Sequence, residues 1–223
     1  MCGLKKAIFG GTFDPIHNGH IYLAYEALEL LKLDKVIFVP SGNPPHKTYK
    51  TVTDASIRCD LIKNAILNES KFEMDLFEVN NTGFSYTYKT LEYFNQLEKN
   101  TEWFFLTGSD CLLELHYWKN VSAILKLCNF VVFNRPGFDE SQISKIKQQT
   151  EKKYGKEITL LKIKPLDISS SMIRLKVRNQ EEIEELVPQN VQISINKLNL
   201  YKEENVNVEW KRHGRVSWKK PKS

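Results

Sequence analysis

Residues 10–20 are Gly10-Gly11-Thr12-Phe13-Asp14-Pro15-Ile16-His17-Asn18-Gly19-His20, and they follow a strand predicted at residues 6–9, Lys-Ala-Ile-Phe. Residues 20–33 then place apolar side chains at three- and four-residue spacings, which predicts an amphipathic helix. The motif therefore joins a predicted strand to a predicted helix. In an open parallel sheet, ligands bind beside such junctions at the carboxyl ends of the strands.

The residue types in this motif indicate phosphate binding. Two glycines let the backbone approach a phosphate closely, and the N-terminus of the next helix adds partial positive charge. His17 and His20 are three apart, so they share a helical face and can both donate hydrogen bonds to a polyphosphate. The alternatives are two structural histidines and half of a zinc site. Zinc needs further ligands, and His46, His116 and the scattered cysteines lack ligand spacing, so phosphate contact is favoured.

The rest of the chain alternates short apolar runs with longer segments of helical period, which is typical of a parallel sheet covered by helices. Strands are predicted at residues 36–40, 72–79, 102–106, 130–133 and 158–163, and helices at residues 56–67, 85–97, 121–127 and 140–154. After Pro165 the pattern is helical. We therefore predict one α/β domain over residues 1–201, a Rossmann-like doubly wound parallel sheet with a helical C-terminal portion, followed by a basic tail at 202–223.

Composition and charge narrow the class of protein. The 223 residues are 41% hydrophobic and 26% charged, which is ordinary for a folded globular protein. The net charge is +5, but residues 211–223 hold six basic and no acidic side chains, which leaves 26 basic and 27 acidic side chains in residues 1–210. The body is nearly neutral, so attraction to a polyanion would come from the tail or from a local pocket.

The sequence also predicts the cellular environment. Four cysteines lie far apart without a CxxC pair, so we expect reduced thiols rather than disulfides or a zinc ribbon. No apolar run reaches the length needed to span a bilayer, and the first residues lack the apolar region of a secretion signal. A cytoplasmic location is expected, with the nucleus as the alternative, and no membrane partner.

A second phosphate-binding pattern follows about 150 residues later, at Ile168-Ser169-Ser170-Ser171-Met172-Ile173-Arg174. Ser169 is a good N-cap, the backbone amides after it suit an anion, and Arg174 can pair with phosphate oxygens. With this pattern the chain resembles the nucleotidyltransferases that carry a His-x-Gly-His signature. The resemblance implies that His17 and His20 bind the phosphates of a nucleoside triphosphate during nucleotidyl transfer.

Further stretches make the chain similar to nicotinate mononucleotide adenylyltransferases of the bacterial type, from about Lys6 to Tyr201. They are Asn43-Pro44-Pro45-His46-Lys47, Ser85-Tyr86-Thr87, Gly108-Ser109-Asp110, Trp118, Leu186-Val187-Pro188 and Leu200-Tyr201. The resemblance implies catalytic roles for His17, His20, Lys47 and Arg174. It implies ATP contacts from Gly10, Gly11, Thr12, Phe13, His17, His20, Gly108, Asp110, Ser170, Ser171 and Arg174, and mononucleotide contacts from Lys47, Thr87 and Trp118.

Four of these residues have a structural alternative when taken singly. Lys47 could be a solvated loop charge, Thr87 a helix-start residue, Asp110 an N-cap, and Trp118 a core or rim aromatic. Their common position after predicted strands favours the site. Ser171 stands where many relatives have threonine, which keeps the hydroxyl.

The expected reaction is transfer of the adenylyl group of ATP to nicotinate mononucleotide, in NAD biosynthesis. Mg²⁺ is expected to arrive with ATP, since the sequence has no evident all-protein cage for it. The alternatives are a phosphopantetheine or cytidylyl transferase of the same superfamily, and an RNA-binding module that uses the tail, where Trp210 and Trp218 stand among basic residues. Nucleic acid is not the favoured partner. The choice between nicotinate and nicotinamide, and the existence of a homo-oligomer, stay open.

Overall fold

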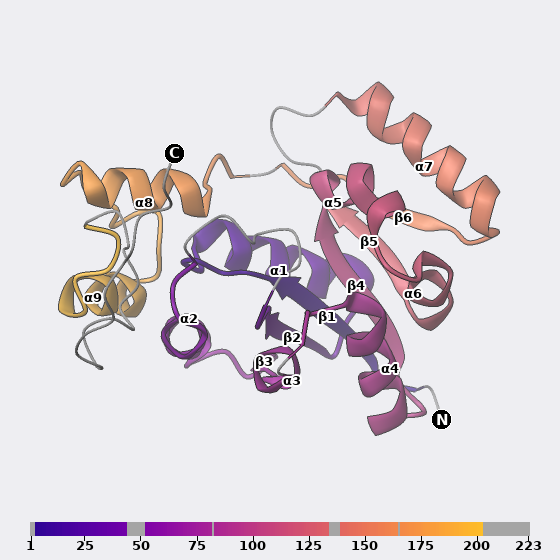
Figure 1. Cartoon of the computed structure of the whole chain (residues 1–223), viewed down its shortest axis with the longest axis horizontal. Helices are drawn as coiled ribbons and strands as arrows, with labels where there is room; N and C mark the ends of the chain where they lie inside the picture. The colour runs from indigo at the N-terminus through magenta and orange to yellow at the C-terminus, as the bar shows by residue number, and fades with distance from the viewer. Residues whose placement is uncertain (1–2, 44–51, 82, 134–138, 165, 203–223) are drawn as a thin grey trace, which may run out of the picture.

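The computed structural model describes residues 3–43, 52–81, 83–133, 139–164 and 166–202. Its centre is a six-stranded, wholly parallel sheet with the order β3-β2-β1-β4-β5-β6 (Figure 1). The strands are β1 Lys5–Gly11, β2 Lys35–Pro40, β3 Phe72–Met74, β4 Glu102–Gly108, β5 Asn129–Phe133 and β6 Ile158–Leu161. The order reverses between β1 and β4, and in such sheets the ligand crevice opens at that point. The predicted doubly wound sheet is confirmed.

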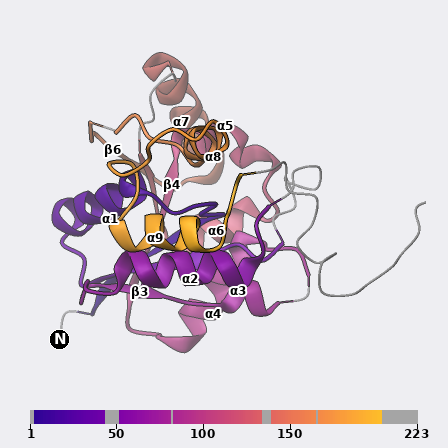
Figure 2. The same cartoon turned by 90° about the vertical axis from the view of Figure 1, so that its left-hand side faces the viewer.

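The helices follow the predicted alternation closely. They are α1 Asn18–Leu31, α2 Ala55–Ile66, α3 Phe77–Asn80, α4 Thr87–Leu97, α5 Ser109–Glu114, the 3₁₀ turn η1 Leu115–Tyr117, α6 Val121–Leu127, α7 Glu140–Tyr154, α8 Ser170–Arg178 and α9 Gln189–Lys197. The helical C-terminal portion is thus α8 and α9. Figure 2 shows α9 beside α2, and the amide of Asn64 donates to the hydroxyl of Ser194 at 3.0 Å across this pair.

Two apolar cores lie on opposite faces of the sheet, because successive strand residues point to opposite sides. Along β1, for example, Phe9 belongs to one core and its neighbour Ile8 to the other. The first core packs against α1, α2, α8 and α9, and the second against α4, α5, α6 and α7. Both faces of the sheet are therefore covered, which leaves the strand ends as the place for a ligand.

The prediction of a strand over residues 72–79 is wrong in its second half. Strand β3 ends at Met74, and the carboxylate of Asp75 accepts a hydrogen bond from the amide of Phe77 at 2.7 Å, which starts the short helix α3. The alternating apolar pattern gave no sign of this turn. The sequence analysis also missed α5 and η1, which directly follow β4.

The described residues bear on the expected state of the cysteines and on the expected lack of membrane spans. Cys59, Cys111 and Cys128 are thiols, as expected, whereas Cys2 lies outside the described residues. None of the described helices is long and apolar enough to cross a membrane.

Candidate active site

The loop between β1 and α1 lies at the switch point of the sheet and is closely packed. A Cβ on Gly11 would come within 2.8 Å of the Phe13 ring, so the chain needs glycine there. Phe13 has a φ of +50° and is 2% exposed, with its ring edge-on to that of His20 at 5.0 Å between centroids. Its side chain therefore belongs to the core and supports His20, and only its backbone can face a nucleotide.

The two histidines lie together, as their spacing predicted. His17 is the N-cap of α1, and its ring stacks on that of His20 with 3.6 Å between centroids. The backbone amide of His17 donates to Nδ1 of His20 at 3.3 Å. Because Nδ1 accepts, Nε2 carries the proton of the neutral His20 ring and serves as its donor. A Cβ on Gly19 would come within 3.0 Å of His17 Nδ1, so the glycine between them keeps the pair in place.

The N-terminus of α8 contacts the same loop from the far end of the sequence. Ser169 caps α8 by accepting from the amide of Met172 at 3.2 Å. The Ser170 hydroxyl donates to the carbonyl of Pro15 at 2.8 Å, and Arg174 Nη1 donates to the carbonyl of Asp14 at 2.6 Å. The two phosphate-binding patterns of the sequence are thus joined by direct hydrogen bonds.

The carboxylate of Asp14 is buried and holds two further segments. It accepts from the backbone amide of Thr53 at 3.2 Å and from the Tyr201 hydroxyl at 2.9 Å. Burial, and then the negative charge of Asp14, raise the pKa of Tyr201 far above its usual value. The phenol therefore stays protonated and remains a donor.

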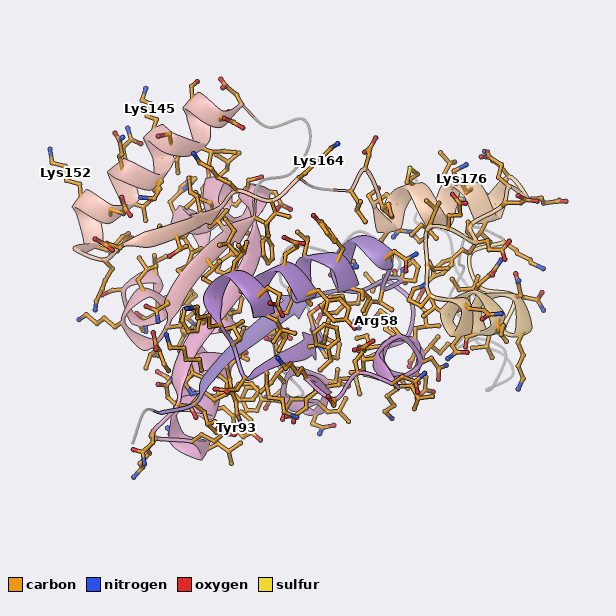
Figure 3. All side chains as sticks on the ribbon, turned by 180° about the vertical axis from the view of Figure 1, so that it is seen from behind. Arg58, Tyr93, Lys145, Lys152, Lys164 and Lys176 are labelled. Carbon is orange, nitrogen blue, oxygen red and sulfur yellow. The ribbon has the colours of Figure 1, made fainter. Side chains whose placement is uncertain are left out.

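Arg58 supports this loop from α2, where it is 1% exposed. Its Nε donates to the carbonyl of Thr53 at 2.8 Å, its Nη1 to that of Thr12 at 2.7 Å and its Nη2 to that of Ser41 at 2.8 Å. Figure 3 shows Arg58 on the inner side of α2, whereas Lys145 and Lys152 project outward from α7. Burial lowers the pKa of Arg58, and the charge of Asp14 opposes that shift. The buried guanidinium thus ties the phosphate-binding loop, through Thr12, to the segments of Ser41 and Thr53.

A second group of expected site residues lies at the ends of α4 and η1. Thr87 is the first residue of α4, and Trp118 is the C-cap of η1, partly buried and edge-on to Phe105 at 6.2 Å. The ammonium of Lys119 lies 4.7 Å from the centre of the Tyr86 ring. This contact brings the segment of Thr87 beside the segment of Trp118.

The remaining expected residues divide into described and undescribed ones. Gly108 ends β4, and Asp110 is in the first turn of α5. Ser171 is exposed and its hydroxyl accepts from Arg174 Nη2 at 3.3 Å. Gly10 and Thr12 are in or directly after β1. Lys47 lies outside the described residues. Over the described ranges, no group of three or more His, Cys, Asp or Glu side chains is arranged to hold a metal ion.

Most of this chain is similar to known proteins. The family model described as cytidylyltransferase-like matches residues 8–176. The chain belongs to the cytidylyltransferase-like family. Within that family it is similar to proteins named probable nicotinate-nucleotide adenylyltransferase. The one from Clostridium novyi is 57% identical over 198 residues, which cover 89% of this chain and 99% of that protein. The one from Clostridium kluyveri is 52% identical over 202 residues, with coverages of 89% and 100%. The resemblance inferred from the motifs is confirmed.

Two solved structures have a fold similar to that of this chain. The nicotinic acid mononucleotide adenylyltransferase of Plasmodium falciparum, complexed with NaAD, has a TM-score of 0.72 and 22% sequence identity. The match covers 92% of this chain and 100% of that one. A putative nicotinate-nucleotide adenylyltransferase from Vibrio parahaemolyticus has a TM-score of 0.63 and 20% identity, with coverages of 90% and 96%. At these identities the likeness establishes the fold.

Three residues that hold the phosphate-binding loop have side chains whose role was not predicted from the sequence. They are Asp14 and Tyr201, which stand in the quoted stretches, and Arg58, which stands in none of them. A signal for Arg58 was present. In the predicted helix over residues 56–67, Arg58 shares a face with the apolar Leu61 and Ile62, where a lone charge needs a buried partner.

Proposed function

We propose that this protein transfers the adenylyl group of ATP to nicotinate mononucleotide, forming nicotinate adenine dinucleotide and pyrophosphate. The observation that carries the proposal is the union of the two phosphate-binding patterns at the switch point. Arg174 and Ser170 reach the loop that carries His17 and His20. Relatives named for this activity and up to 57% identical support the choice of substrates.

The reaction needs no covalent intermediate with the protein. An oxygen of the mononucleotide 5′-phosphate attacks the α-phosphorus of ATP in line, a new P–O bond forms, and the bond to the bridging oxygen breaks to release pyrophosphate. Negative charge grows on that leaving oxygen. Positioned donors stabilise such charge without reorganising, and we assign this role to His17, His20, Arg174 and Lys47.

The proposed substrate contacts form two groups, one for each substrate. We assign to ATP the residues Gly10, Gly11, Thr12, Phe13, Gly108, Asp110, Ser170 and Ser171, in addition to the two histidines and Arg174. We assign Lys47, Thr87 and Trp118 to the mononucleotide. The contact between Lys119 and Tyr86 supports the second group, because it holds the segments of Thr87 and Trp118 side by side.

Mg²⁺ is proposed as a companion of ATP. The buried carboxylate of the loop itself, that of Asp14, already accepts from Thr53 and Tyr201. The donors around the loop are imidazoles, amides and a guanidinium, and these groups suit phosphate oxygens better than a hard cation. We therefore expect the triphosphate and water to supply the metal's ligands. Bound in this way, the ion would neutralise part of the triphosphate charge.

The assay that tests the function is release of pyrophosphate from ATP. We expect release with nicotinate mononucleotide and Mg²⁺ together, and none when either is omitted or when phosphopantetheine or choline phosphate replaces the mononucleotide. Equal rates with those substitutes would refute the substrate assignment. Nicotinamide mononucleotide belongs in the panel, since it decides which pyridine the enzyme prefers.

Substitution of the phosphate-binding residues tests the mechanism. His17→Ala, His20→Ala and Arg174→Ala should each lower turnover about a hundredfold or more, as loss of a preorganised donor does. The matched control is His116→Ala, because His116 is exposed and lies outside the proposed site. Near-normal turnover by a folded His20→Ala protein would contradict the assigned role.

Location and assembly are part of the same proposal. We propose a cytoplasmic enzyme without a membrane or nucleic-acid partner. The nuclear alternative gains no support, since the relatives named above are clostridial. The oligomeric state stays open between a monomer and a homo-oligomer, and sedimentation of the purified protein would decide it.

A further inference from the structure

Leu186-Val187-Pro188, a stretch that supports the family resemblance, lies between α8 and α9, and the proposed chemistry gives it no role. The backbone amide of Leu186 donates to the carbonyl of Ile183 at 3.0 Å, which closes a turn. The side chains of Ile183 and Val187 are buried in the first apolar core, one on each side of this turn. The turn is therefore a fixed part of the fold, and a group that bonds to its carbonyls is fixed with it.

Two carbonyls of this turn bind Asn18, the residue that follows His17 in the His-x-Gly-His motif. The side-chain nitrogen Nδ2 of Asn18 donates to the carbonyl of Glu185 at 2.8 Å, and the backbone amide of Asn18 donates to the carbonyl of Leu186 at 2.9 Å. A carbonyl can only accept, so the nitrogen of the side-chain amide must face Glu185. The first residue of α1 is thus bound at two points, by its side chain and by its backbone.

These two bonds complete an anchorage on both sides of His17. Before it in the sequence, side chains of α8 donate to the carbonyls of Asp14 and Pro15. After it, Asn18 donates to the turn between α8 and α9. His17 therefore lies between two attachments to the C-terminal portion of the chain, and its ring stacks on that of His20.

We propose that Asn18 is a positioning residue for the two histidines. The inference rests on the proposed function, which assigns His17 and His20 to the negative charge that grows on the leaving oxygen. Donors stabilise such charge best when they are already held in the productive geometry. The backbone bond to Leu186 alone is a pivot, about which the start of α1 can turn. The side-chain bond to Glu185 removes that freedom.

Asn18→Leu is the discriminating variant, because leucine has nearly the shape of asparagine but no donor. It removes the bond to Glu185 and keeps the backbone bond. The matched control is Asn95→Leu. The side-chain amide of Asn95 also donates to backbone carbonyls, those of Leu91 at 2.8 Å and Leu127 at 3.1 Å. These bonds join α4 to α6 on the face of the sheet opposite to α1, so the control loses the same kind of bond away from the histidines.

Steady-state kinetics test the proposal. Asn18→Leu should lower kcat about fivefold, because loss of one hydrogen bond lowers the population of the productive geometry by about that factor. The KM for nicotinate mononucleotide should stay within about twofold, since its proposed contacts lie elsewhere. Asn95→Leu should lower the melting temperature and leave kcat within about twofold. Asn18→Ala should behave as Asn18→Leu does, and it carries the test if the leucine variant fails to fold. Equal kcat values for Asn18→Leu and Asn95→Leu would overturn the inference.

The stacking of the two histidine rings gives a readout that needs no turnover. Their centroids are 3.6 Å apart, so NMR should show a nuclear Overhauser effect between the ring protons of His17 and His20. This effect should weaken in Asn18→Leu and keep its strength in Asn95→Leu, and an unchanged effect in Asn18→Leu would contradict the positioning role. A wild-type protein without adenylyl transfer would refute the proposed function, while the NMR experiment would still decide whether Asn18 holds the histidines.

Discussion

Arg58 donates to three backbone carbonyls that lie 5, 17 and 46 residues away from it in the sequence. Periodicity predicted the helix that carries it, since Leu61 and Ile62 give that segment its apolar face. Periodicity says nothing about carbonyl partners in other loops, which exist only once β1 and β2 are side by side. The residues that a motif names could be predicted from the sequence, whereas the partners of a supporting residue such as Arg58 could not.

Arg58→Met should therefore destabilise the protein strongly. The substitution leaves the carbonyls of Thr53, Thr12 and Ser41 without this donor, and each buried acceptor that stays unsatisfied costs about 1–3 kcal/mol. For a chain of this size, a total of about 3 kcal/mol lowers the melting temperature by roughly 6–12 °C. Lys63→Met on the exposed side of α2 is the control. Melting temperatures that match between the two variants would show that Arg58 is replaceable.

Trp118 gives a test of substrate placement at the scale of one side chain. If its indole stacks on the pyridine ring, Trp118→Ala should raise the KM for the mononucleotide roughly fivefold, because such stacking contributes about 1 kcal/mol. The KM for ATP should change little. The neighbouring Tyr117, 72% exposed, supplies the control Tyr117→Ala. A parallel rise in both KM values would instead assign Trp118 to packing against Phe105.

At the scale of elements, most strands and helices could be predicted because each buries an apolar face with its own period. Helix α3, like α5 and η1, is an exception. Residues 75–80 have the apolar content of a strand, but the Asp75 carboxylate caps the Phe77 amide and the buried Glu78 needs partners in α4. A side chain that accepts from a backbone amide two residues later ends the strand, and alternation alone does not reveal it.

The ion pair of Lys6 and Glu98 predicts a pH dependence between elements. It joins β1 to the C-cap of α4 at 2.7 Å. Burial alone would raise the pKa of Glu98, but hydrogen bonds from Lys6 and Thr101 outweigh burial and hold the pKa below its usual value. A lowered folded-state pKa gives stability that is present above the unfolded pKa of about 4.3 and is lost as pH falls through the folded value.

Lys6→Met should accordingly cost at most about 1 kcal/mol at pH 7, since the pair is partly exposed. The difference from wild type should shrink as pH falls below about 5 and then through the lowered pKa of Glu98, because the carboxylate becomes protonated in both proteins. Urea unfolding at each pH measures it. A difference that stays constant across this range would show that packing of the lysine stem, rather than its charge, is responsible.

At the scale of the whole molecule, the site depends on segments far apart in the sequence. Asp14 contacts Arg174 through its carbonyl and Tyr201 through its carboxylate. The resemblance to a known family predicted that residues 10–20 and 168–174 act together, because both motifs were recognised. The bond to Tyr201 could not be predicted, since neither residue type nor spacing links it to Asp14.

Truncation locates the boundary of the domain. We propose that the domain ends at residue 201, so a chain that stops after Lys202 should keep the turnover and melting temperature of the full chain. A chain that stops after Leu200 loses Tyr201, a ring only 2% exposed. Removal of such a ring costs about 3 kcal/mol or more, which corresponds to a fall of roughly 6 °C or more. If the chain that stops after Lys202 also lost activity, the basic residues that follow it would belong to the fold.

The hydrogen bond between Asp14 and Tyr201 also has a consequence for synthesis. The two residues are 187 positions apart, so a ribosome that adds about 5–20 residues per second makes Asp14 roughly 10–40 s before Tyr201. From the addition of His20 until the addition of Ser170, the nascent chain has both glycines and both histidines but lacks Ser170, Arg174 and Tyr201, which hold the loop in its folded form. Each new molecule therefore carries the first of its two phosphate-binding patterns for most of its synthesis before the loop can take its final shape.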